Sequence, residues 1–390
     1  MNNKVKILQI GMTRNIGGLE TYLMQQFDNI DKNKLQYDFV NITSEYDIVF
    51  RDKIVKKGSR IYNILSRHKN PIRHYWQWIK LLSNVGKQYK GIILNSNSLT
   101  YIYPLFIAKF FGISIRVLHS HNAGFEGKVS LFRKSLIYLN RILMDYSVTD
   151  YFACSDKAGQ WMFPSKDYRV IHNAIDPEPY CFDSKRRNKI RMENGLVGKF
   201  VVGHVGRFTY QKNQEFLIRL WQKFSEIYPA SLLLLVGSGE KEAEIKRLAQ
   251  TLKLNNILYL GQREDVPELM QAMDCFVLPS HFEGLCLVGI EAQAAGLPCF
   301  FADKITREVG ITRLANFISL NEPDKWISAM GECKDTTKRK NMLNEVTTAG
   351  YDINLEIKNM EAIYLKGRKI TQCTPPPRLT YQMRRIMLAA

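Results

Sequence analysis

Short apolar runs of strand length alternate with amphipathic helical segments along almost the whole chain. The pattern opens with the predicted strand VKILQI and the predicted helix GGLETYLMQQFDNI, and it starts afresh near residue 198 with FVVGHVGR and QEFLIRLWQKFSEIY. Strands that alternate with helices form parallel sheets covered on both faces. A chain of 390 residues also exceeds one ordinary core. We therefore predict an α/β fold with two Rossmann-like parallel-sheet domains facing across a cleft, which is where a ligand would bind.

The restart of the pattern sets the expected domain boundaries. We expect one domain over residues 1–180 and a second over residues 181–355. A last helix over 356–369 and a tail over 370–390 complete the chain. The tail contains three consecutive prolines, which break any preceding helix.

The segment PSHFEGLCLVGIEAQAAGLPC places Glu283 and Glu291 eight positions apart. The run CFVLP before it is typical of a strand buried on both faces. Glu283 is therefore expected in the loop at the carboxyl end of a strand, and Glu291 one and a half to two turns into the next helix. The N–H groups of Gly284 to Leu287 would form that helix N-terminus, which favours phosphate. Two carboxylates beside a phosphate site suit a sugar nucleotide, a diphosphate between two polyhydroxylated rings.

Two cations follow another predicted strand. Arg207 and Lys212 come after VVGHVG, in a loop that contains Gly206. One arginine side chain can bind two phosphate oxygens at once, and lysine adds a compact positive charge. The two residues therefore suit a diphosphate group. No D-x-D triplet follows a predicted strand, and we expect no metal cofactor.

Glycines and histidines mark strand ends in the first half. Gly17 and Gly18 follow the first strand and open a helix, a weaker variant of the Gly-rich phosphate loop. His119 and His121 end the predicted strand ISIRVLHSH and lie on the same side of an extended chain. Histidines at strand ends are often only polar rim residues. His119 matches the strand terminus better, His121 is the alternative, and Asn122 would shape the loop that follows.

The positive charge is concentrated in the first half. Residues 1–195 carry 30 Lys and Arg against 16 Asp and Glu, a net charge of +14, whereas residues 196–390 carry 25 against 21, a net charge of +4. Aromatic residues stand among the cations at residues 67–78, a mixture that suits an anionic membrane surface. A general solubility charge is the alternative, and nothing resembles a nucleic-acid module.

We expect neither a membrane-spanning segment nor a signal peptide. No apolar run reaches membrane-spanning length, and the first ten residues do not form a signal peptide. Seven scattered cysteines favour a reducing compartment over a disulfide framework or structural zinc. We expect a cytoplasmic protein, peripheral to the inner face of the cell membrane.

Several segments together resemble the retaining glycosyltransferases of family 4, in the branch that builds capsular and extracellular polysaccharides. Besides the two-glutamate segment, the resemblance rests on ILQIGMTRNIGGLETYL, VIHNAID, HVGRFTYQKNQEFLI, LLLLVGSGE and ILYLGQREDVPELMQAMDCFVLPS. It spans roughly residues 4 to 365. It implies the GT-B fold, with an acceptor-binding first domain, a nucleotide-sugar-binding second domain and a last helix that crosses back to the first.

The resemblance also implies roles for particular residues. Glu283 would accept hydrogen bonds from donor-sugar hydroxyls and Glu291 from the ribose, while His119 would lie beside the donor sugar. His119, Arg207, Lys212 and Glu283 form the expected catalytic set. Further donor contacts are expected from Gly17, Gly18, Gly206, Gly237, Arg263, Val266, Gly284, Leu285, Cys286 and Leu287, and secondary ones from His121, Asn122 and Asn173.

The implied reaction is transfer of a hexosyl group from a nucleotide sugar, most simply a UDP-sugar, to a polyprenyl-diphosphate-linked saccharide. In this scheme the leaving phosphate deprotonates the acceptor. Two alternatives remain: a sugar-nucleotide epimerase of the same fold, and a non-catalytic sugar-nucleotide-binding protein. The sequence leaves the sugar, the accepting hydroxyl and the oligomeric state open.

Overall fold

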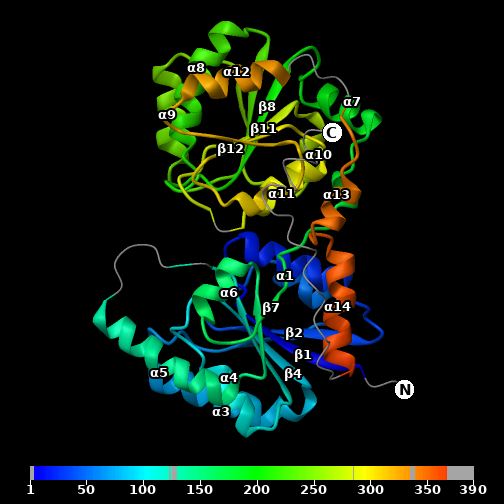
Figure 1. The fold of residues 1–390 in the computed structure, drawn as a ribbon. Helices are drawn as coiled ribbons and strands as arrows, with labels where there is room; N and C mark the ends of the chain where they lie inside the picture. Colours follow the sequence, from blue (N-terminus) through cyan, green and yellow to red (C-terminus); the bar gives the residue numbers. More distant parts are fainter. Residues whose placement is uncertain (1–3, 123, 125–129, 284, 334–338, 367–390) are drawn as a thin grey trace. The chain divides into compact units, whose positions relative to one another are not determined.

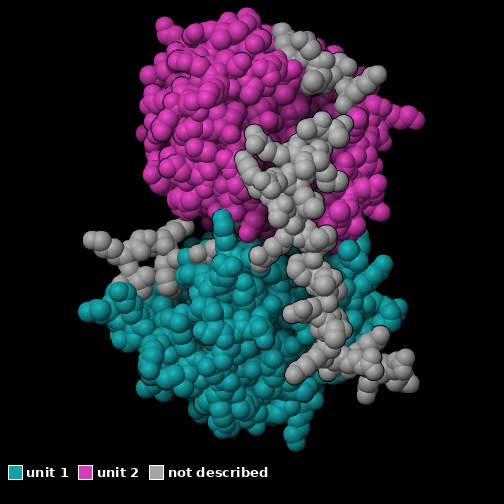
Figure 2. Space-filling model, viewed as in Figure 1, with its two compact units in different colours: residues 1–174, 353–373 teal, residues 175–352, 374–390 magenta. Residues whose placement is uncertain are grey.

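The computed structural model describes residues 4–122, 124, 130–283, 285–333 and 339–366. The chain divides into two compact units, coloured separately in Figure 2. Unit 1 takes the chain up to Ala174 and the segment from Ile353, and unit 2 takes Ile175–Asp352. No helix in the described ranges is long and apolar enough to cross a membrane.

Unit 1 is built on a sheet of the order β3-β2-β1-β4-β5-β6-β7, in which all neighbours are parallel (Figure 1). Its strands are β1 (Val5–Ile10), β2 (Leu35–Asn41), β3 (Ile61–Asn63), β4 (Gly91–Ser96), β5 (Ile115–Ser120), β6 (Asp150–Ala153) and β7 (Arg169–Val170). Its helices are α1 (Gly18–Asn29), α2 (Arg51–Lys56), α3 (Pro71–Val85), α4 (Tyr103–Phe110), α5 (Leu131–Ser147), α6 (Asp156–Met162) and α14 (Ile353–Lys366), with a 3₁₀ turn at Gly86–Gln88.

Unit 2 repeats the arrangement with the strand order β10-β9-β8-β11-β12-β13, again parallel throughout. Its strands are β8 (Phe200–Val205), β9 (Ser231–Val236), β10 (Ile257–Tyr259), β11 (Cys275–Leu278), β12 (Cys299–Ala302) and β13 (Ala315–Ile318). Its helices are α7 (Ser184–Glu193), α8 (Gln214–Ile227), α9 (Glu242–Thr251), α10 (Val266–Ala272), α11 (Leu287–Ala294), α12 (Pro323–Glu332) and α13 (Leu343–Thr348), with 3₁₀ turns η2 (Glu178–Tyr180) and η3 (Arg307–Val309). The prediction of two parallel-sheet α/β domains is confirmed.

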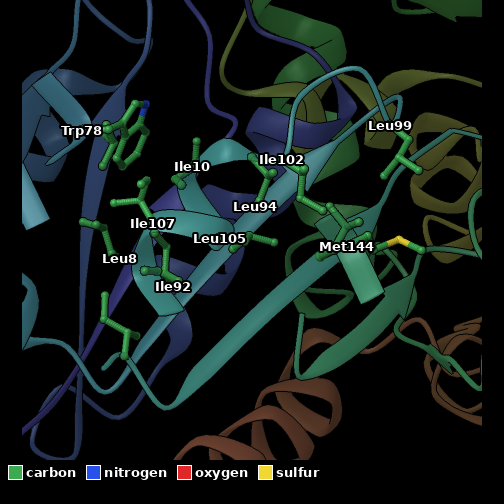
Figure 3. Close-up of a cluster of buried hydrophobic side chains, with 14 of the residues drawn as sticks. Leu8, Ile10, Trp78, Ile92, Leu94, Leu99, Ile102, Leu105, Ile107 and Met144 are labelled. Carbon is green, nitrogen blue, oxygen red and sulfur yellow. The ribbon is translucent and has the colours of Figure 1, made fainter. Parts of the chain in front are cut away.

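One large core of unit 1 lies between the sheet and helices α3, α4 and α5 (Figure 3). Leu8 and Ile92 reach it from β1 and β4, while Trp78, Leu105 and Met144 reach it from the three helices. Each of these side chains is at most 3% exposed. Burial of one large apolar side chain stabilises a fold by about 1.5–3 kcal/mol, so this layer holds the three helices against the sheet.

The chain changes from one unit to the other at two neighbouring points. Ile175 and Asp352 form a parallel bridge, and the Ile175 N–H donates to the carbonyl of Tyr351 at 2.9 Å. The chain passes from unit 1 to unit 2 between residues 174 and 175 and returns to unit 1 between residues 352 and 353. The sequence pattern suggested these domain boundaries a few residues later, at 180/181 and 355/356. The predicted tail, 370–390, lies outside the described residues.

Helix α14 packs on α1 inside unit 1 through a buried carboxyl group. Glu356 Oε1 accepts hydrogen bonds from Tyr22 Oη at 2.6 Å and from Gln26 Nε2 at 3.2 Å. Burial raises the pKa of Glu356 to about 8, against the opposing effect of these two hydrogen bonds. The folded protein therefore holds a proton at neutral pH that an exposed glutamic acid releases.

We expect Glu356→Gln to stabilise the protein in alkaline but not in acidic solution. The substitution keeps an oxygen for Tyr22 and removes the ionisable group. Because the folded-state pKa lies above the ordinary value, the folded state binds more protons than the unfolded state, and wild-type stability falls as the pH rises from about 4.5 towards 8. The Tm of the variant should exceed that of the wild type by roughly 2–8 °C at pH 8.5 and match it at pH 4. An equal difference at both pH values would contradict this role.

Candidate active site

Each sheet reverses its direction of growth at one pair of neighbouring strands. In unit 1 the chain builds outward from β1 to β3 and then returns to place β4 on the other side of β1, and in unit 2 β8 and β11 are related in the same way. The loops after two such strands diverge, and ligands of open parallel sheets bind there. Arg207 and Lys212 follow β8, Glu283 follows β11, and Gly17 follows β1.

A buried ion pair joins the two loops of unit 2. Lys212 Nζ lies 2.7 Å from Glu283 Oε1, and the two side chains are 15% and 7% exposed. Burial lowers the pKa of Lys212, but the neighbouring acidic groups Cys286 and Glu283 more than reverse this effect, and the net shift is upward. Burial raises the pKa of the Cys286 thiol itself to about 12.

Further hydrogen bonds brace the same two loops. Glu283 Oε1 also accepts from Ser280 Oγ at 2.7 Å, and Glu283 Oε2 accepts from Gln211 Nε2 at 3.1 Å. Asn213 donates its side-chain N–H to the carbonyl of Pro279 at 3.1 Å and adopts the left-handed conformation, with φ of 55°. The carboxylate of Glu283 is therefore held in place by three donors from two loops.

A second chain of hydrogen bonds positions the backbone of Arg207. His204, a fully buried residue of β8, has Nδ1 2.9 Å from the carbonyl of Val277, and Gln214 Nε2 lies 3.2 Å from its Nε2. Burial lowers the pKa of His204 to about 4, so the ring is neutral and donates from Nδ1. Gln214 Nε2 also donates to the carbonyl of Arg207 at 2.9 Å. The side chain of Arg207 itself is exposed.

Gly237 allows the Arg207 loop to approach the next strand. Its φ is +130°, and a Cβ at this position would lie 2.1 Å from the carbonyl oxygen of Gly206. Any side chain at residue 237 would therefore displace the loop. A Cβ on Gly206 would meet the Lys212 side chain at 3.3 Å.

Helix α11 starts later than the sequence suggested. Cys286 is its N-cap and Leu287 its first residue, so the helix does not begin near Gly284, which lies outside the described residues. Glu291 is consequently the fifth residue, little more than one turn into the helix rather than one and a half to two. Leu285 lies in the preceding loop. The first N–H groups of the helix, on Leu287 and Val288, have no acceptor within the helix itself.

Glu291 is buried beside Tyr180 of η2. Burial raises the pKa of Glu291 to about 7, while a hydrogen bond with Tyr180 and the charge of Lys212 act in the opposite direction. The side chain is 7% exposed. The sequence pattern did not single out Tyr180, because no motif connects it with a helix more than a hundred residues later.

Two other predicted donor-binding residues lie at the start of α10. Arg263 forms a bidentate pair with Asp265, with N···O distances of 2.7 and 2.6 Å, and Val266 is the first residue of the helix. The structure thus places them in unit 2, with the guanidinium of Arg263 already engaged.

The structure separates the two histidines of unit 1. His119 is 1% exposed, and its Nε2 has no hydrogen-bond partner, whereas His121 is partly exposed. Their ring centroids lie 4.0 Å apart, and Tyr22 lies beside both rings. Exposure therefore favours His121 over His119 as the histidine that can touch a ligand.

Two asparagines hold the ring of His121. Its Nε2 lies 3.0 Å from Asn95 Oδ1, and its Nδ1 lies 3.1 Å from Asn173 Oδ1. Asn95 Nδ2 donates to Gln9 Oε1 and to the carbonyl of Ile10, so its oxygen must face the histidine. Burial lowers the pKa of His121 to about 3, so the ring is neutral and only one of its two nitrogens carries a proton.

The glycine-containing loop after β1 is closed by an acidic side chain. Glu20 Oε1 accepts from the Thr13 N–H at 3.2 Å and from Thr13 Oγ1 at 2.7 Å. Gly17 is the N-cap of α1 and Gly18 its first residue. Gly11, which the sequence pattern did not select, is the position in this loop that requires a glycine. Its φ is +129°, and a Cβ there would lie 2.7 Å from the carbonyl oxygen of Asn95.

The site residues thus fall into two groups, one in each unit. Gly17, Gly18, His119, His121, Asn122 and Asn173 belong to unit 1, and the other described site residues belong to unit 2. No cluster of three or more His, Cys, Asp or Glu side chains that could hold a metal ion occurs in the part of the chain that the structure describes.

Comparison with known proteins gives a consistent family. Residues 186–311 match the model of glycosyl transferases group 1. An uncharacterized glycosyltransferase of Methanocaldococcus jannaschii, MJ1059, is 37% identical over 296 residues, which cover 68% of this chain and 72% of that protein. The putative glycosyltransferase EpsF of Bacillus subtilis is 28% identical over 380 residues, covering 93% and 97%.

A third relative has a defined activity in its name. It is the UDP-Gal:alpha-D-GlcNAc-diphosphoundecaprenol alpha-1,3-galactosyltransferase of Escherichia coli, 25% identical over 387 residues, covering 93% of this chain and 97% of that protein. Among solved structures, Anabaena Alr3699/HepE in complex with UDP-glucose superposes with a TM-score of 0.73 at 20% identity, over 93% of this chain and all of the other. The two parallel-sheet units thus form the GT-B fold, as predicted.

The Lys212–Glu283 pair gives a prediction for stability. Lys212→Met leaves a buried carboxylate without its cation, and Glu283→Gln leaves a buried cation without its anion, so each variant should lose about 3 kcal/mol in free energy of unfolding. The double variant should lose clearly less than the sum, because it removes both charges. Urea unfolding of the three variants measures this, and single losses that add within about 0.5 kcal/mol would contradict the coupling.

Proposed function

This chain belongs to the group 1 glycosyl transferases, and we propose that it transfers a hexosyl group from a UDP-sugar to a polyprenyl-diphosphate-linked saccharide, with retention of configuration. The transfer serves the synthesis of a capsular or extracellular polysaccharide. The observation that carries the proposal is the buried Lys212–Glu283 pair, braced at the carboxyl ends of β8 and β11 beside the exposed Arg207.

The donor diphosphate binds to the cations of unit 2. Lys212 uses one of its three N–H donors on Glu283, and the others remain for phosphate oxygens. Arg207 adds a second cation, held by the bond from Gln214 to its carbonyl. The first N–H groups of α11 supply neutral donors. Together these groups stabilise the charge that grows on the leaving diphosphate, without a metal ion.

Glu283 has room for one sugar hydroxyl. A carboxylate offers about four acceptor positions, and Lys212, Ser280 and Gln211 occupy three of them. The position left on Oε2 accepts one donor-sugar hydroxyl, which fixes the orientation of the sugar. Glu283 therefore orients the donor and is not the nucleophile, and the leaving phosphate deprotonates the acceptor.

Glu291 accepts hydrogen bonds from the ribose hydroxyls. With a pKa of about 7, Glu291 is protonated in part of the molecules at neutral pH. A ribose that donates two hydrogen bonds to the carboxylate favours its ionised form. Tyr180 positions this carboxylate from η2. In unit 1, the neutral ring of His121, held by Asn95 and Asn173, takes the ligand-contacting role that the family resemblance assigned to His119.

The nature of donor and acceptor is supported by relatives. The E. coli enzyme is named for a UDP-galactose donor and a diphosphoundecaprenol-linked acceptor, and the Anabaena protein was solved with UDP-glucose. A polyprenyl-linked acceptor lies in a bilayer, so we place the enzyme in the cytoplasm, on the inner face of the cell membrane. The net charge of +14 over residues 1–195 attracts an anionic leaflet.

A donor panel tests the proposal. The purified protein is incubated with UDP-glucose, UDP-galactose, UDP-N-acetylglucosamine and GDP-mannose, together with polyprenyl-diphosphate-linked mono- and oligosaccharides, with and without EDTA. We expect transfer from one UDP-sugar, retention at the anomeric carbon, and equal rates with EDTA. Arg207→Ala should lower turnover about a hundredfold, as loss of an oxyanion stabiliser does, whereas Arg219→Ala, at an exposed position of α8, should not change it.

Three outcomes would contradict it. Conversion of the donor sugar without an acceptor would identify an epimerase, and tight donor binding without any turnover would identify a binding protein. Loss of activity in EDTA would overturn the metal-free stabilisation of the leaving group.

A further inference from the structure

Helix α5 of unit 1 has one buried face and one solvent-exposed face, and both carry apolar side chains. Its inner face enters the core, where Met144 is 3% exposed. Its outer face carries large apolar side chains in solvent. They are Leu131 (80% exposed), Phe132 (79%), Tyr138 (68%), Leu139 (57%), Ile142 (56%) and Tyr146 (53%).

These six side chains form one stripe along the helix, interrupted by the exposed Ser135. At 3.6 residues per turn, their positions fall within roughly 120° of the helix circumference, and the helix extends about 25 Å. Lys134 and Arg141, both exposed, follow one border of the stripe. Asp145 on the same border is paired with Lys166 at 3.0 Å, so the border remains cationic.

The neighbouring helices extend the stripe. Phe110 at the end of α4 is 64% exposed and contacts Phe106, whose ring centroid lies 6.1 Å from that of Tyr146. Lys109 Nζ lies 3.2 Å from the centroid of the Tyr146 ring. Three aromatic rings and the ammonium group of Lys109 thus lie together where α4 packs on α5.

Helix α3, which packs on α4, adds a smaller apolar group. Ile72 and Trp76 are 83% and 58% exposed, and Lys80 lies over the Trp76 ring. The cluster at residues 67–78 that the sequence suggested for a membrane contact is only partly available, because His74 and Trp78 are buried. The greater exposed apolar surface lies on α5, which the sequence pattern did not single out.

An apolar stripe of this size that is exposed to water marks an interaction surface. A second copy of the chain fits poorly, because the stripe is bordered by cations and the chain carries a net charge of +18, so two copies repel each other. An anionic leaflet satisfies both features: apolar side chains enter the acyl boundary, aromatic rings lie at the headgroups, and lysine and arginine meet the phosphates.

We propose that the outer face of α5 is the element that inserts into an anionic bilayer, with α4 and α3 as its flanks. The inference deepens the membrane-peripheral location given under the proposed function and names its surface. It depends on no donor, acceptor or turnover.

The test is binding of the full-length protein to vesicles of phosphatidylcholine with and without about 20% phosphatidylglycerol, at two salt concentrations. Ile142→Glu is compared with Ile227→Glu, a matched control, because Ile227 is 58% exposed on helix α8 of unit 2. Both variants should keep the wild-type Tm. We expect wild-type binding that requires anionic lipid and falls with salt, partition at least about tenfold weaker for Ile142→Glu, and no change for Ile227→Glu.

The outcomes separate the inference from the proposed function. Binding by the wild type that Ile142→Glu leaves unchanged would overturn the assignment of α5 and leave the membrane location standing. Absence of wild-type binding would overturn both, although transfer to a short-chain, water-soluble acceptor would still support the reaction. A dimer in solution that Ile142→Glu dissociates would identify a second copy as the occupant and contradict the inference.

Discussion

The ion pair between Lys212 and Glu283 is the interaction on which the candidate site depends. It joins the loop after β8 to the loop after β11, and these two strands are neighbours only because the sheet changes its direction of growth between them. A buried charge without a partner is costly, so each residue fixes the position of the other. Ser280, Gln211 and Asn213 hold the same two loops, and the chain from His204 through Gln214 fixes the backbone of Arg207.

Unit 1 follows the same principle with neutral groups. The ends of β1, β4 and β5 bring Gln9, Asn95 and His121 together, and the hydrogen bond from Asn95 to Gln9 turns the Asn95 amide oxygen towards the histidine. Beneath them, Tyr22 contacts both histidine rings and donates to Glu356 of α14. The last helix of unit 1 is therefore connected to the strand-end polar groups through one buried tyrosine.

Much of this arrangement was predictable from sequence, and the missing parts have physical reasons. Long apolar runs such as SLLLLV predict buried strands, and residues at strand ends then share one edge of a sheet. Helix α2 and strand β3 span only six and three residues, too few for a periodic pattern. Asn95 and Tyr180 belong to no motif and act through neighbours distant in sequence. The exposure of the outer face of α5 could not be predicted, because an apolar periodic pattern is typical of a core helix whether or not both of its faces are covered.

The central claim is that Arg207 and Lys212 bind the diphosphate of a uridine nucleotide, and its most direct measurement is calorimetric binding of UDP and of uridine to the wild type and to Arg207→Met. The exposed side chain of Arg207 can be replaced without disturbing the buried pair. UDP should bind the variant roughly 10 to 100 times more weakly, as loss of a charge-assisted hydrogen bond implies, while uridine affinity stays the same. UDP affinity equal in both proteins, or a parallel loss for uridine, would contradict it.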